Sequence, residues 1–431
     1  MTSTITVAIA GLTHLGIVTA AGLAEKGFRV IAWDPDPDRA RRLAAGDSIV
    51  SEPGLKDLLN RNRDRLVFSE RCADLGDADL IYIAADVPTD DQGQSTLESI
   101  VALINEVSAA RAAKALLTIL CQVPPGFTRR LEVPKDRLFY QVETLIFGRA
   151  VERTLQPERF IIGCADPGQP LPLALKAVLS AHDCPILPMR YESAELAKIS
   201  INCFLVAQVT TTNTLAEICE TIGADWSEIA PALKLDRRIG PHAYLAPGLG
   251  ISGGNLERDL ATVTELSRGS GDGGTHFRGT EAGVVDAWRR NSVWRKDWLY
   301  RALEQTVFHN QDDPRVAVLG LAYKENTDSI KNSPSIALLE QLKGRRIRVH
   351  DPVVPTSLVP WAEPASSPLD ACTDADVLVI ATPWPVYREM SLTDIAARMK
   401  GRFIIDPFAV LSDQQPKERG FAWRRLGAPG D

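Results

Sequence analysis

The sequence has no long apolar run, no export signal and no excess of positive charge. Its 431 residues contain nothing approaching the ~20 consecutive apolar residues that cross a bilayer. Residues 1–10 lack the charged segment and the cleavage site of a signal peptide, and they are instead typical of a first strand. We therefore expect a soluble, cytoplasmic protein without a membrane partner.

Cysteine usage and charge exclude further classes of protein. The seven cysteines are scattered, odd in number and never spaced as a CxxC pair. This usage is typical of a reduced protein without a disulfide framework or a zinc site, and we expect no bound metal. The net charge of −7 comes without a basic stripe or an arginine-rich arm, which argues against nucleic acid as a partner. An anionic small molecule stays open as a ligand, because a few local cations can hold it.

What the chain does contain is an alternation of short apolar runs with helical patterns. The runs are rich in β-branched residues, as buried parallel strands are. Such an alternation predicts an α/β protein with two Rossmann-like, doubly wound lobes. The predicted strands cover 5–11, 28–34, 80–85, 115–120 and 159–163 in the first lobe, and 315–320, 346–351, 377–382 and 402–406 in the second.

Residues 193–222 separate the two lobes and keep helical apolar spacing without a proline or a glycine. At ~1.5 Å per residue, this segment predicts one helix of roughly 45 Å. A helix of that length is too long to cover a sheet, so we expect a long central helix that joins the lobes and contributes to a dimer interface. The glycine-rich segment 267–280 predicts a mobile loop.

The turn after the first predicted strand is typical of a dinucleotide site. It reads GLTHLG at 11–16, where a Rossmann unit holds a pyrophosphate against a helix N-terminus. Asp34 ends the second strand, where a carboxylate binds both ribose hydroxyls and repels a 2′-phosphate, so we predict NAD rather than NADP. The predicted cofactor-binding residues are Gly11, Thr13, His14, Leu15, Gly16 and Asp34.

Thr13 stands where the dinucleotide pattern has its middle glycine. That glycine lets the backbone approach the pyrophosphate closely, so we expect Thr13 to shift or weaken the contact. The opposing interpretation of the whole pattern is a Rossmann-like lobe that has lost its cofactor.

Five further segments, taken in their order and spacing, resemble the UDP-glucose/GDP-mannose dehydrogenase family over nearly the whole chain. They are RYESAELAKISINCF (190–204), DRRIGPHAYLAPGLG (236–250), GGNLERD (253–259), LGLAYKENTDSIKNSP (319–334) and VIATPW (379–384). The resemblance implies two Rossmann-like lobes around a long helix, a nucleotide-sugar substrate and a homodimer or larger assembly. The family oxidises C6 of the sugar twice, and the second oxidation passes through a cysteine thiohemiacetal and a thioester.

The resemblance also implies three domains. We expect an NAD-binding Rossmann domain over 1–190 and a central helical domain with the dimer interface over 191–297. Residues 298–431 should then form a C-terminal, Rossmann-like domain that binds the nucleotide sugar.

Several family site residues are retained. Lys198 and Asn202 lie one helical turn apart and match the lysine and asparagine that steady the developing sugar oxyanion. Glu143 matches the first glutamate of the family's PEFLREG segment, and Asp259 matches the aspartate of its cysteine motif.

Other matches are assigned to ligand binding. Arg238 matches an arginine that reaches the sugar of the partner subunit, and Lys324 matches a lysine near the nucleotide sugar. Lys331 stands where the family has an arginine that contacts NAD. Lysine keeps the positive charge but lacks the planar guanidinium, which can donate two parallel hydrogen bonds. The remaining residues that the resemblance places at the substrate are Thr144, Leu145, Tyr244 and Gly250, besides Glu143 and Lys198.

The departures are concentrated in one half of the family's reaction. The nucleophilic cysteine aligns with Asn255, and an amide cannot form a thiohemiacetal. The water-placing threonine aligns with Gln122, and the second glutamate of PEFLREG aligns with Phe147. The family's lysine beside the cysteine aligns with Arg258, and a family threonine on the cofactor side aligns with Val87. The thioester and water machinery is therefore altered, while the hydride-transfer residues remain.

This pattern favours a redox-neutral enzyme that epimerises a nucleotide sugar through transient oxidation by bound NAD. Lys198 or Glu143 would be the acid/base group, and Asn202, Asn255 and Gln122 would hold sugar hydroxyls, since amides offer both donors and an acceptor. Three alternatives stay open: a two-electron dehydrogenase that releases an aldehyde or ketone, a four-electron dehydrogenase that works without cysteine, and a non-catalytic binding subunit.

Overall fold

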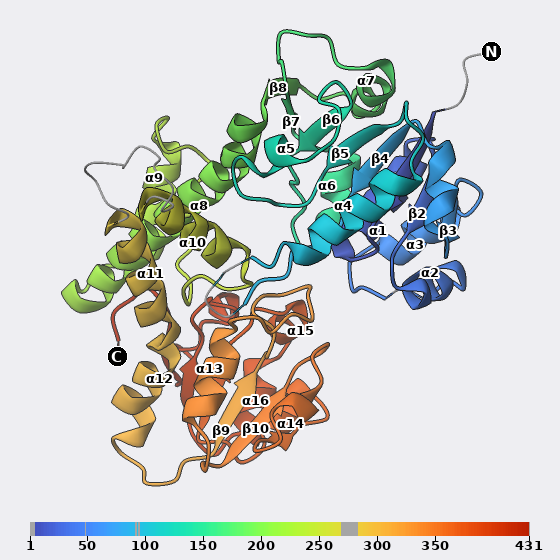
Figure 1. Ribbon diagram of the computed structural model, residues 1–431. Helices are drawn as coiled ribbons and strands as arrows, with labels where there is room; N and C mark the ends of the chain where they lie inside the picture. Colours follow the sequence, from blue (N-terminus) through green and yellow to red (C-terminus); the bar gives the residue numbers. More distant parts are fainter. Residues whose placement is uncertain (1–4, 48, 91–92, 94, 269–282, 431) are drawn as a thin grey trace. The chain divides into compact units, whose positions relative to one another are not determined.

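The computed structural model describes residues 5–47, 49–90, 93, 95–268 and 283–430. The chain divides into two compact units, Met1–Ile201 and Asn202–Asp431, and the boundary falls inside the long helix α8 (Tyr191–Ile222) (Figure 1). The three-domain division at residues 190 and 297 stays a prediction.

The first unit is built on an eight-stranded sheet with the order β3-β2-β1-β4-β5-β6-β7-β8. Its first six strands are parallel and follow the Rossmann order 3-2-1-4-5-6. β7 pairs antiparallel to β6, so the sheet is mixed rather than wholly parallel. The strands are β1 (Thr6–Ala10), β2 (Arg29–Trp33), β3 (Leu66–Ser69), β4 (Leu80–Ile83), β5 (Leu116–Ile119), β6 (Leu138–Gln141), β7 (Phe160–Cys164) and β8 (Ile186–Arg190).

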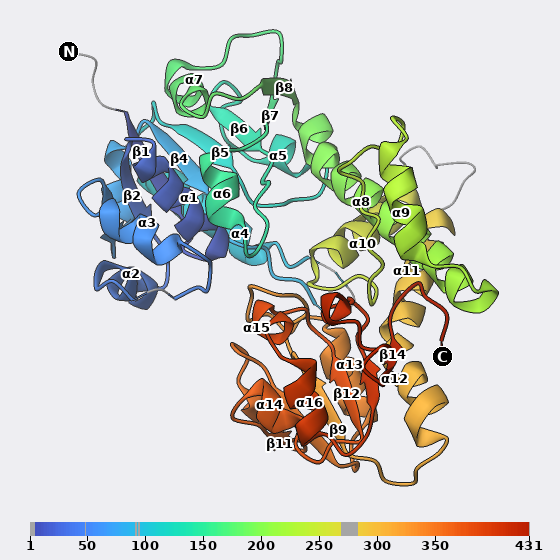
Figure 2. The ribbon, with the colours of Figure 1, turned by 180° about the vertical axis from the view of Figure 1, so that it is seen from behind.

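Apolar side chains on both faces explain why these strands lie in the middle of the unit. In β1, Val7 and Ile9 pack into one core while Ala8 and Ala10 pack into another, as the two-residue period of a strand requires. Helices α1, α3 and α6 cover the first face, and α4 covers the second (Figures 1 and 2). The helices of this unit are α1 (His14–Glu25), α2 (Pro37–Ala44), α3 (Leu55–Arg61), α4 (Glu98–Ala110), α5 (Phe127–Arg130), α6 (Ala150–Leu155) and α7 (Leu173–Ser180).

The second unit holds a six-stranded parallel sheet with the order β11-β10-β9-β12-β13-β14. Counted along the chain, this order is again 3-2-1-4-5-6, so the prediction of two Rossmann-like lobes is confirmed. The strands are β9 (Val316–Leu319), β10 (Ile347–His350), β11 (Glu363–Pro364), β12 (Val377–Ile380), β13 (Phe403–Ile405) and β14 (Ala422–Arg424).

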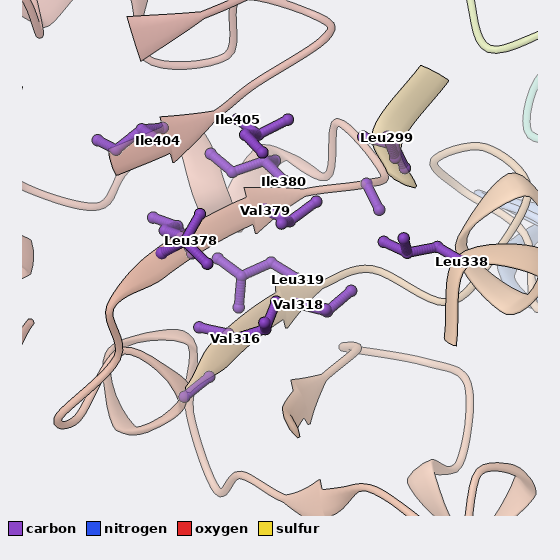
Figure 3. Close-up of a cluster of buried hydrophobic side chains, with 14 of the residues drawn as sticks. Leu299, Val316, Val318, Leu319, Leu338, Leu378, Val379, Ile380, Ile404 and Ile405 are labelled. Atoms are coloured by element: carbon purple, nitrogen blue, oxygen red, sulfur yellow. The ribbon is translucent and has the colours of Figure 1, made fainter. Parts of the chain in front are cut away.

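One large core fills this second lobe. Figure 3 shows side chains of β9, β12 and β13 interleaved with Leu299 and Leu338 from two helices. The helices of the unit are α9 (Trp226–Leu235), α10 (Asn255–Arg268), α11 (Gly283–Lys296), α12 (Trp298–Leu303), α13 (Pro334–Gln341), α14 (Pro368–Ala371), α15 (Pro385–Arg388) and α16 (Leu392–Arg398).

The long central helix is confirmed, and it begins two residues earlier than predicted, at Tyr191. The loop predicted over 267–280 is replaced at its start by the end of α10 at Arg268, and its remaining residues, 269–280, lie outside the described residues. Over the part of the chain that the structure describes, no helix combines the length and apolarity needed to cross a membrane.

The core in Figure 3 gives a stability prediction. Leu378 in β12 is fully buried, so Leu378→Ala should lower the free energy of unfolding of this lobe by about 2–5 kcal/mol. Leu358 is half exposed, and Leu358→Ala should change the free energy of unfolding by less than about 0.5 kcal/mol. Urea unfolding followed by tryptophan fluorescence measures both, and equal losses in the two variants would contradict the assigned core.

Candidate active site

The turn between β1 and α1 is shaped by two glycines. Gly11 has a φ of +103°, and a Cβ there would lie 2.8 Å from the backbone nitrogen of Ala85. A Cβ on Gly16 would lie 1.8 Å from the carbonyl oxygen of Gly11. Both positions therefore require glycine. The turn delivers the chain into α1 at His14, where the first N–H groups have no partner within the helix and suit a phosphate.

Thr13 adopts an extended conformation that does not need glycine, with a φ of −88°. Its hydroxyl accepts a hydrogen bond of 2.8 Å from the N–H of Asp86, in the segment after β4. The Asp86 carboxylate in turn accepts from the N–H of Leu15 at 3.4 Å. Thr13 therefore ties the turn to its neighbour, and its effect on pyrophosphate stays a prediction.

Asp34 follows β2 and is buried beside the same turn. One carboxylate oxygen accepts from the N–H of Leu12 at 2.6 Å, and the other accepts from the N–H of Asp36 at 2.9 Å. The Arg39 guanidinium, which is about half exposed, lies 3.3 Å away. The carboxylate is thus fixed at the carboxyl end of the sheet, where it fits a ribose diol. Val87 follows Asp86 in the segment after β4 and is buried in the core under α4.

Lys198 and Glu143 form a charged pair within the first unit. The Lys198 Nζ lies 3.3 Å from a carboxylate oxygen of Glu143, and the side chains are only 13% and 16% exposed. Lys198 comes from α8, and Glu143 comes from the segment after β6. The other Glu143 oxygen accepts from the N–H of Leu145, and the Thr144 carbonyl accepts from Arg153. Two predicted catalytic residues are therefore brought together.

A second carboxylate in this unit, Glu52, was not predicted from the sequence. It is buried and accepts three hydrogen bonds: from His14 Nε2 at 2.9 Å, from the N–H of Gly148 at 2.9 Å and from the N–H of Ala150 at 2.7 Å. Burial alone would raise its pKa, but the hydrogen bonds outweigh burial and lower it. Glu52 is therefore a buried anion that holds two separate segments.

Glu195 on α8 likewise holds a segment by accepting its backbone hydrogen bonds, in this case the segment that carries Gln122. The Glu195 carboxylate is fully buried and accepts from the N–H groups of Gly126 at 2.5 Å and Thr128 at 2.8 Å. Here burial dominates and raises the pKa, although the hydrogen bonds oppose it. Gln122 is partly buried at the carboxyl end of β5.

In the second unit, Asn202 contacts Asp259. The Asn202 amide donates to the Asp259 carboxylate at 2.5 Å, and both side chains are buried. Arg258 lies 3.7 Å from the same carboxylate. Asn255 begins α10 one helical turn before Asp259 and is exposed.

The segment after β9 packs against the start of α10. The N–H of Gly253 donates to the carbonyl of Lys331 at 3.0 Å, and Asn332 donates to Glu257. The ammonium of Lys324 lies 5.5 Å above the ring of Tyr323, which itself packs on Gly253. The structure therefore brings Lys324, Lys331 and the segment of Asn255 together within this unit.

The remaining predicted substrate residues lie in the segment between α9 and α10. Arg238 is 89% exposed and donates two hydrogen bonds to Asp236, at 3.0 and 2.7 Å. Tyr244 is half exposed, while Gly250 packs closely on Ser292. The contact of Arg238 with a partner subunit stays a prediction.

The cysteine side chains of the chain are all at least partly buried. All seven are free. Burial raises the pKa of every one of them, so the thiolate is disfavoured. Cys203, next to Asn202, reaches about 11 because burial and the Asp259 charge both raise its pKa. Within the described ranges, no three histidine, cysteine or acidic side chains gather as a metal site would require.

These features are typical of a dinucleotide-dependent enzyme: a glycine turn at a helix N-terminus, a buried carboxylate after the second strand and a mostly buried Lys–Glu ion pair. The chain belongs to the UDP-glucose/GDP-mannose dehydrogenase family. Its NAD binding domain matches residues 5–178, its central domain 192–277 and its UDP binding domain 317–413. NAD is therefore the cofactor, and the substrate is a nucleotide sugar.

Relatives match over almost the whole chain. A UDP-glucose 6-dehydrogenase of Pseudomonas aeruginosa is 29% identical, over 98% of this chain and 97% of its own. A UDP-glucose dehydrogenase structure from Pyrobaculum islandicum has a TM-score of 0.84 and 25% identity, over 100% and 99% of the two chains. A UDP-D-ManNAc dehydrogenase structure from Pyrococcus horikoshii shares the fold, with a TM-score of 0.81 and 23% identity over 98% and 99%.

The Glu52 anion predicts a pH-dependent contribution to stability. Because its folded pKa is below the ordinary 4.5, the contribution is complete above that pH and is lost as the pH falls through the lowered pKa. Glu52→Gln should cost about 1–3 kcal/mol at neutral pH, and the gap to wild type should shrink in acid. Urea unfolding of the wild type and of Glu52→Gln, at neutral pH and in acid, measures the difference between their free energies of unfolding.

Glu70, which is exposed and paired with Arg41, supplies the control. Glu70→Gln should cost at most about 1 kcal/mol, because an exposed ion pair contributes little. If the Glu52→Gln gap is the same at neutral and acid pH, the side chain is not held as an anion.

Proposed function

We propose that the chain isomerises a nucleotide-linked sugar by transient oxidation with NAD and does not carry the sugar to the acid. The observation that carries this proposal is the mostly buried Lys198–Glu143 ion pair, in a chain where burial raises the pKa of every cysteine thiol. The pair supplies what hydride transfer needs, while the thioester route has no nucleophile.

The chain's own groups can move the protons that the reaction requires. Lys198 stabilises the oxygen of the carbinol as it loses its proton, and Glu143, 3.3 Å away, accepts that proton and returns it. Asn202 adds an amide donor one turn further along α8, and Asp259 fixes its orientation. NAD, when bound, accepts the hydride and gives it back.

Isomerisation then follows from the carbonyl stage. If the carbonyl carbon was a stereocentre, return of the hydride to its other face inverts it. If the carbonyl is a C6 aldehyde, the adjacent C–H becomes acidic; a base removes this proton and the proton returns on the opposite face. In both cases the sugar regains its two electrons, so neither NAD nor water is consumed.

The altered residues fit recognition better than acyl chemistry. Asn255 and Gln122 each offer amide donors and an acceptor for sugar hydroxyls. We propose Thr144, Leu145, Arg238, Tyr244, Gly250 and Lys324 as further substrate contacts, and Lys331 and Val87 as cofactor contacts. The match of residues 317–413 to a UDP binding domain supports a uridine nucleotide.

A second candidate function is a two-electron dehydrogenase that releases the carbonyl product. The names of the relatives favour it, because those proteins are dehydrogenases. The two candidates differ in electron balance: isomerisation returns NADH to NAD, whereas the dehydrogenase accumulates one NADH for each sugar.

The reaction is tested with UDP-glucose and UDP-N-acetylmannosamine, each incubated with NAD at about one hundredth of the sugar concentration. We expect NMR to show a new stereoisomer in excess over NAD, without net absorbance at 340 nm. Lys198→Ala should slow its formation by at least about 100-fold. Lys176→Ala, on the exposed face of α7, should leave the rate unchanged.

With stoichiometric NAD, the other outcomes separate the alternatives. One NADH per sugar and no isomer would establish the second candidate. Two NADH with a uronate would show oxidation to the acid without cysteine. Binding of NAD and sugar with no turnover of either substrate would contradict every catalytic interpretation.

We also propose that the chain forms a homodimer through α8. Phe204 and Ile222 are 73% and 70% exposed, and Leu215 and Ile218 are also exposed. At 100° per residue these four positions fall within about 60° of one another around the helix. An exposed apolar stripe of this kind is typical of a protein interface. Dimers in the resembled family support a second copy as its partner.

Charge on this stripe should abolish the dimer. Phe204→Glu combined with Ile222→Glu is expected to convert a dimer of about 94 kDa, twice the 47.0 kDa chain, into a monomer in sedimentation velocity, because buried charges without partners are unfavourable. Leu173→Glu, at an equally exposed apolar site on α7, should leave the dimer intact. A wild-type chain that is monomeric at micromolar concentration would refute the proposal.

A further inference from the structure

Two segments that lie far apart in the sequence are held by the same buried carboxylate. His14 belongs to the first turn of α1, in the cofactor turn. Gly148 and Ala150 follow Glu143 along the chain and lead into α6. Glu52 accepts hydrogen bonds from all three, at 2.9, 2.9 and 2.7 Å.

These bonds are costly to break. Glu52 has no exposed side-chain surface, and a buried carboxylate without donors is strongly unfavourable. If His14 moved away, Glu52 would lose one of its three donors and would have to shift toward water or toward the remaining two. The position of His14 and the position of the 148–150 backbone are therefore energetically linked.

A second contact joins the same two segments. The ring of Phe147 lies 4.3 Å from the ring of His14, centroid to centroid. The other end of the segment is held by Arg153, which donates to the carbonyl of Thr144 at 3.3 Å. Leu15, from the cofactor turn, and Glu143 also line one common cavity in this unit. The segment from Glu143 to Ala150 is thus packed on the cofactor turn along much of its length.

We propose that Glu52 and His14 are positioning residues that couple occupation of the cofactor turn to the placement of Glu143 opposite Lys198. When NAD binds the N-terminus of α1, it restricts the turn; His14 transmits this restriction through Glu52 to Gly148 and Ala150. The catalytic meaning of Glu143 rests on the proposed function, but the coupling itself requires only that NAD binds.

The coupling is reciprocal, because two linked equilibria share one interaction free energy. If bound NAD raises the equilibrium constant for ordering the 143–150 segment by a certain factor, the ordered segment raises the affinity for NAD by the same factor. Such couplings are typically about 5- to 150-fold. Breaking the link should therefore have two effects of equal size, on protection of the segment and on NAD affinity.

Two substitutions of His14 separate the hydrogen bond from the ring contact. His14→Gln keeps an N–H donor for Glu52 and loses the ring. His14→Phe keeps a ring against Phe147 and loses the donor. Neither changes the backbone N–H groups of the turn, and calorimetry measures the NAD affinity of each variant. Circular dichroism and thermal unfolding confirm that each variant is folded.

The experiment measures hydrogen–deuterium exchange of a peptide covering 143–155, with and without saturating NAD and with no sugar present. In the wild type, NAD should slow exchange at least about 5-fold. His14→Gln should keep most of this effect. His14→Phe should lose it, and its Kd for NAD by calorimetry should rise by the same factor. A peptide from α4 serves as the internal control.

Three results would overturn the coupling: equal protection by NAD in all three proteins, loss in His14→Gln as well as in His14→Phe, or a Kd that does not change when protection is lost. Because no sugar is present, these results are independent of turnover. An inactive enzyme that still shows the NAD-dependent protection would contradict the proposed function and leave the coupling established.

Discussion

Backbone N–H groups at the carboxyl ends of parallel strands need acceptors, and in the first unit buried carboxylates meet that need. Asp34 accepts from the N–H of Leu12 in the turn after β1, and Glu195 accepts from the N–H of Gly126 in the segment after β5. Glu52 accepts from the imidazole of His14 and from the N–H of Ala150 at the start of α6. Each carboxylate accepts at least two hydrogen bonds. The loops around the cofactor are therefore positioned by internal anions, and the rest of the site depends on them.

The ion pair between Lys198 and Glu143 is a further charge contact in the first unit. The two charged groups lie 3.3 Å apart and their side chains are mostly buried, so each charge is compensated by the other. Beside the turn after β1, the ring of Phe147 packs on the ring of His14. His14 Nε2 is also hydrogen-bonded to Glu52, so an aromatic contact and a buried carboxylate hold the same side chain.

The sequence predicted the buried strands well and the edges poorly. β1, β2, β4, β5, β9, β10, β12 and β13 lie within predicted runs, and β7 extends one residue beyond its run, because interior strands need apolar side chains on both faces. β3, β8, β11 and β14 were missed: they are edge strands, and β8 even contains Pro188. β6, an interior strand, was missed because its sequence, LFYQ, contains no β-branched residue. Glu52 and Glu195 were missed for another reason: the donors of Glu52 lie 38, 96 and 98 residues away, those of Glu195 lie 69 and 67 residues away, and no local pattern indicates such contacts.

Strand order alone does not select the lobe that binds NAD, because both lobes have the same order and place an aspartate after the second strand. The difference lies in how those aspartates are used. Asp351 accepts from the N–H groups of Leu321, Ala322, Val353 and Val354 and from the indole of Trp384. A carboxylate has about four lone-pair sites, so Asp351 has none left for a ribose. Asp34 accepts from two backbone N–H groups and from the half-exposed Arg39, which a ribose diol can displace at little cost. The hydrogen-bonding capacity left on the carboxylate, rather than the topology, assigns NAD to the first lobe.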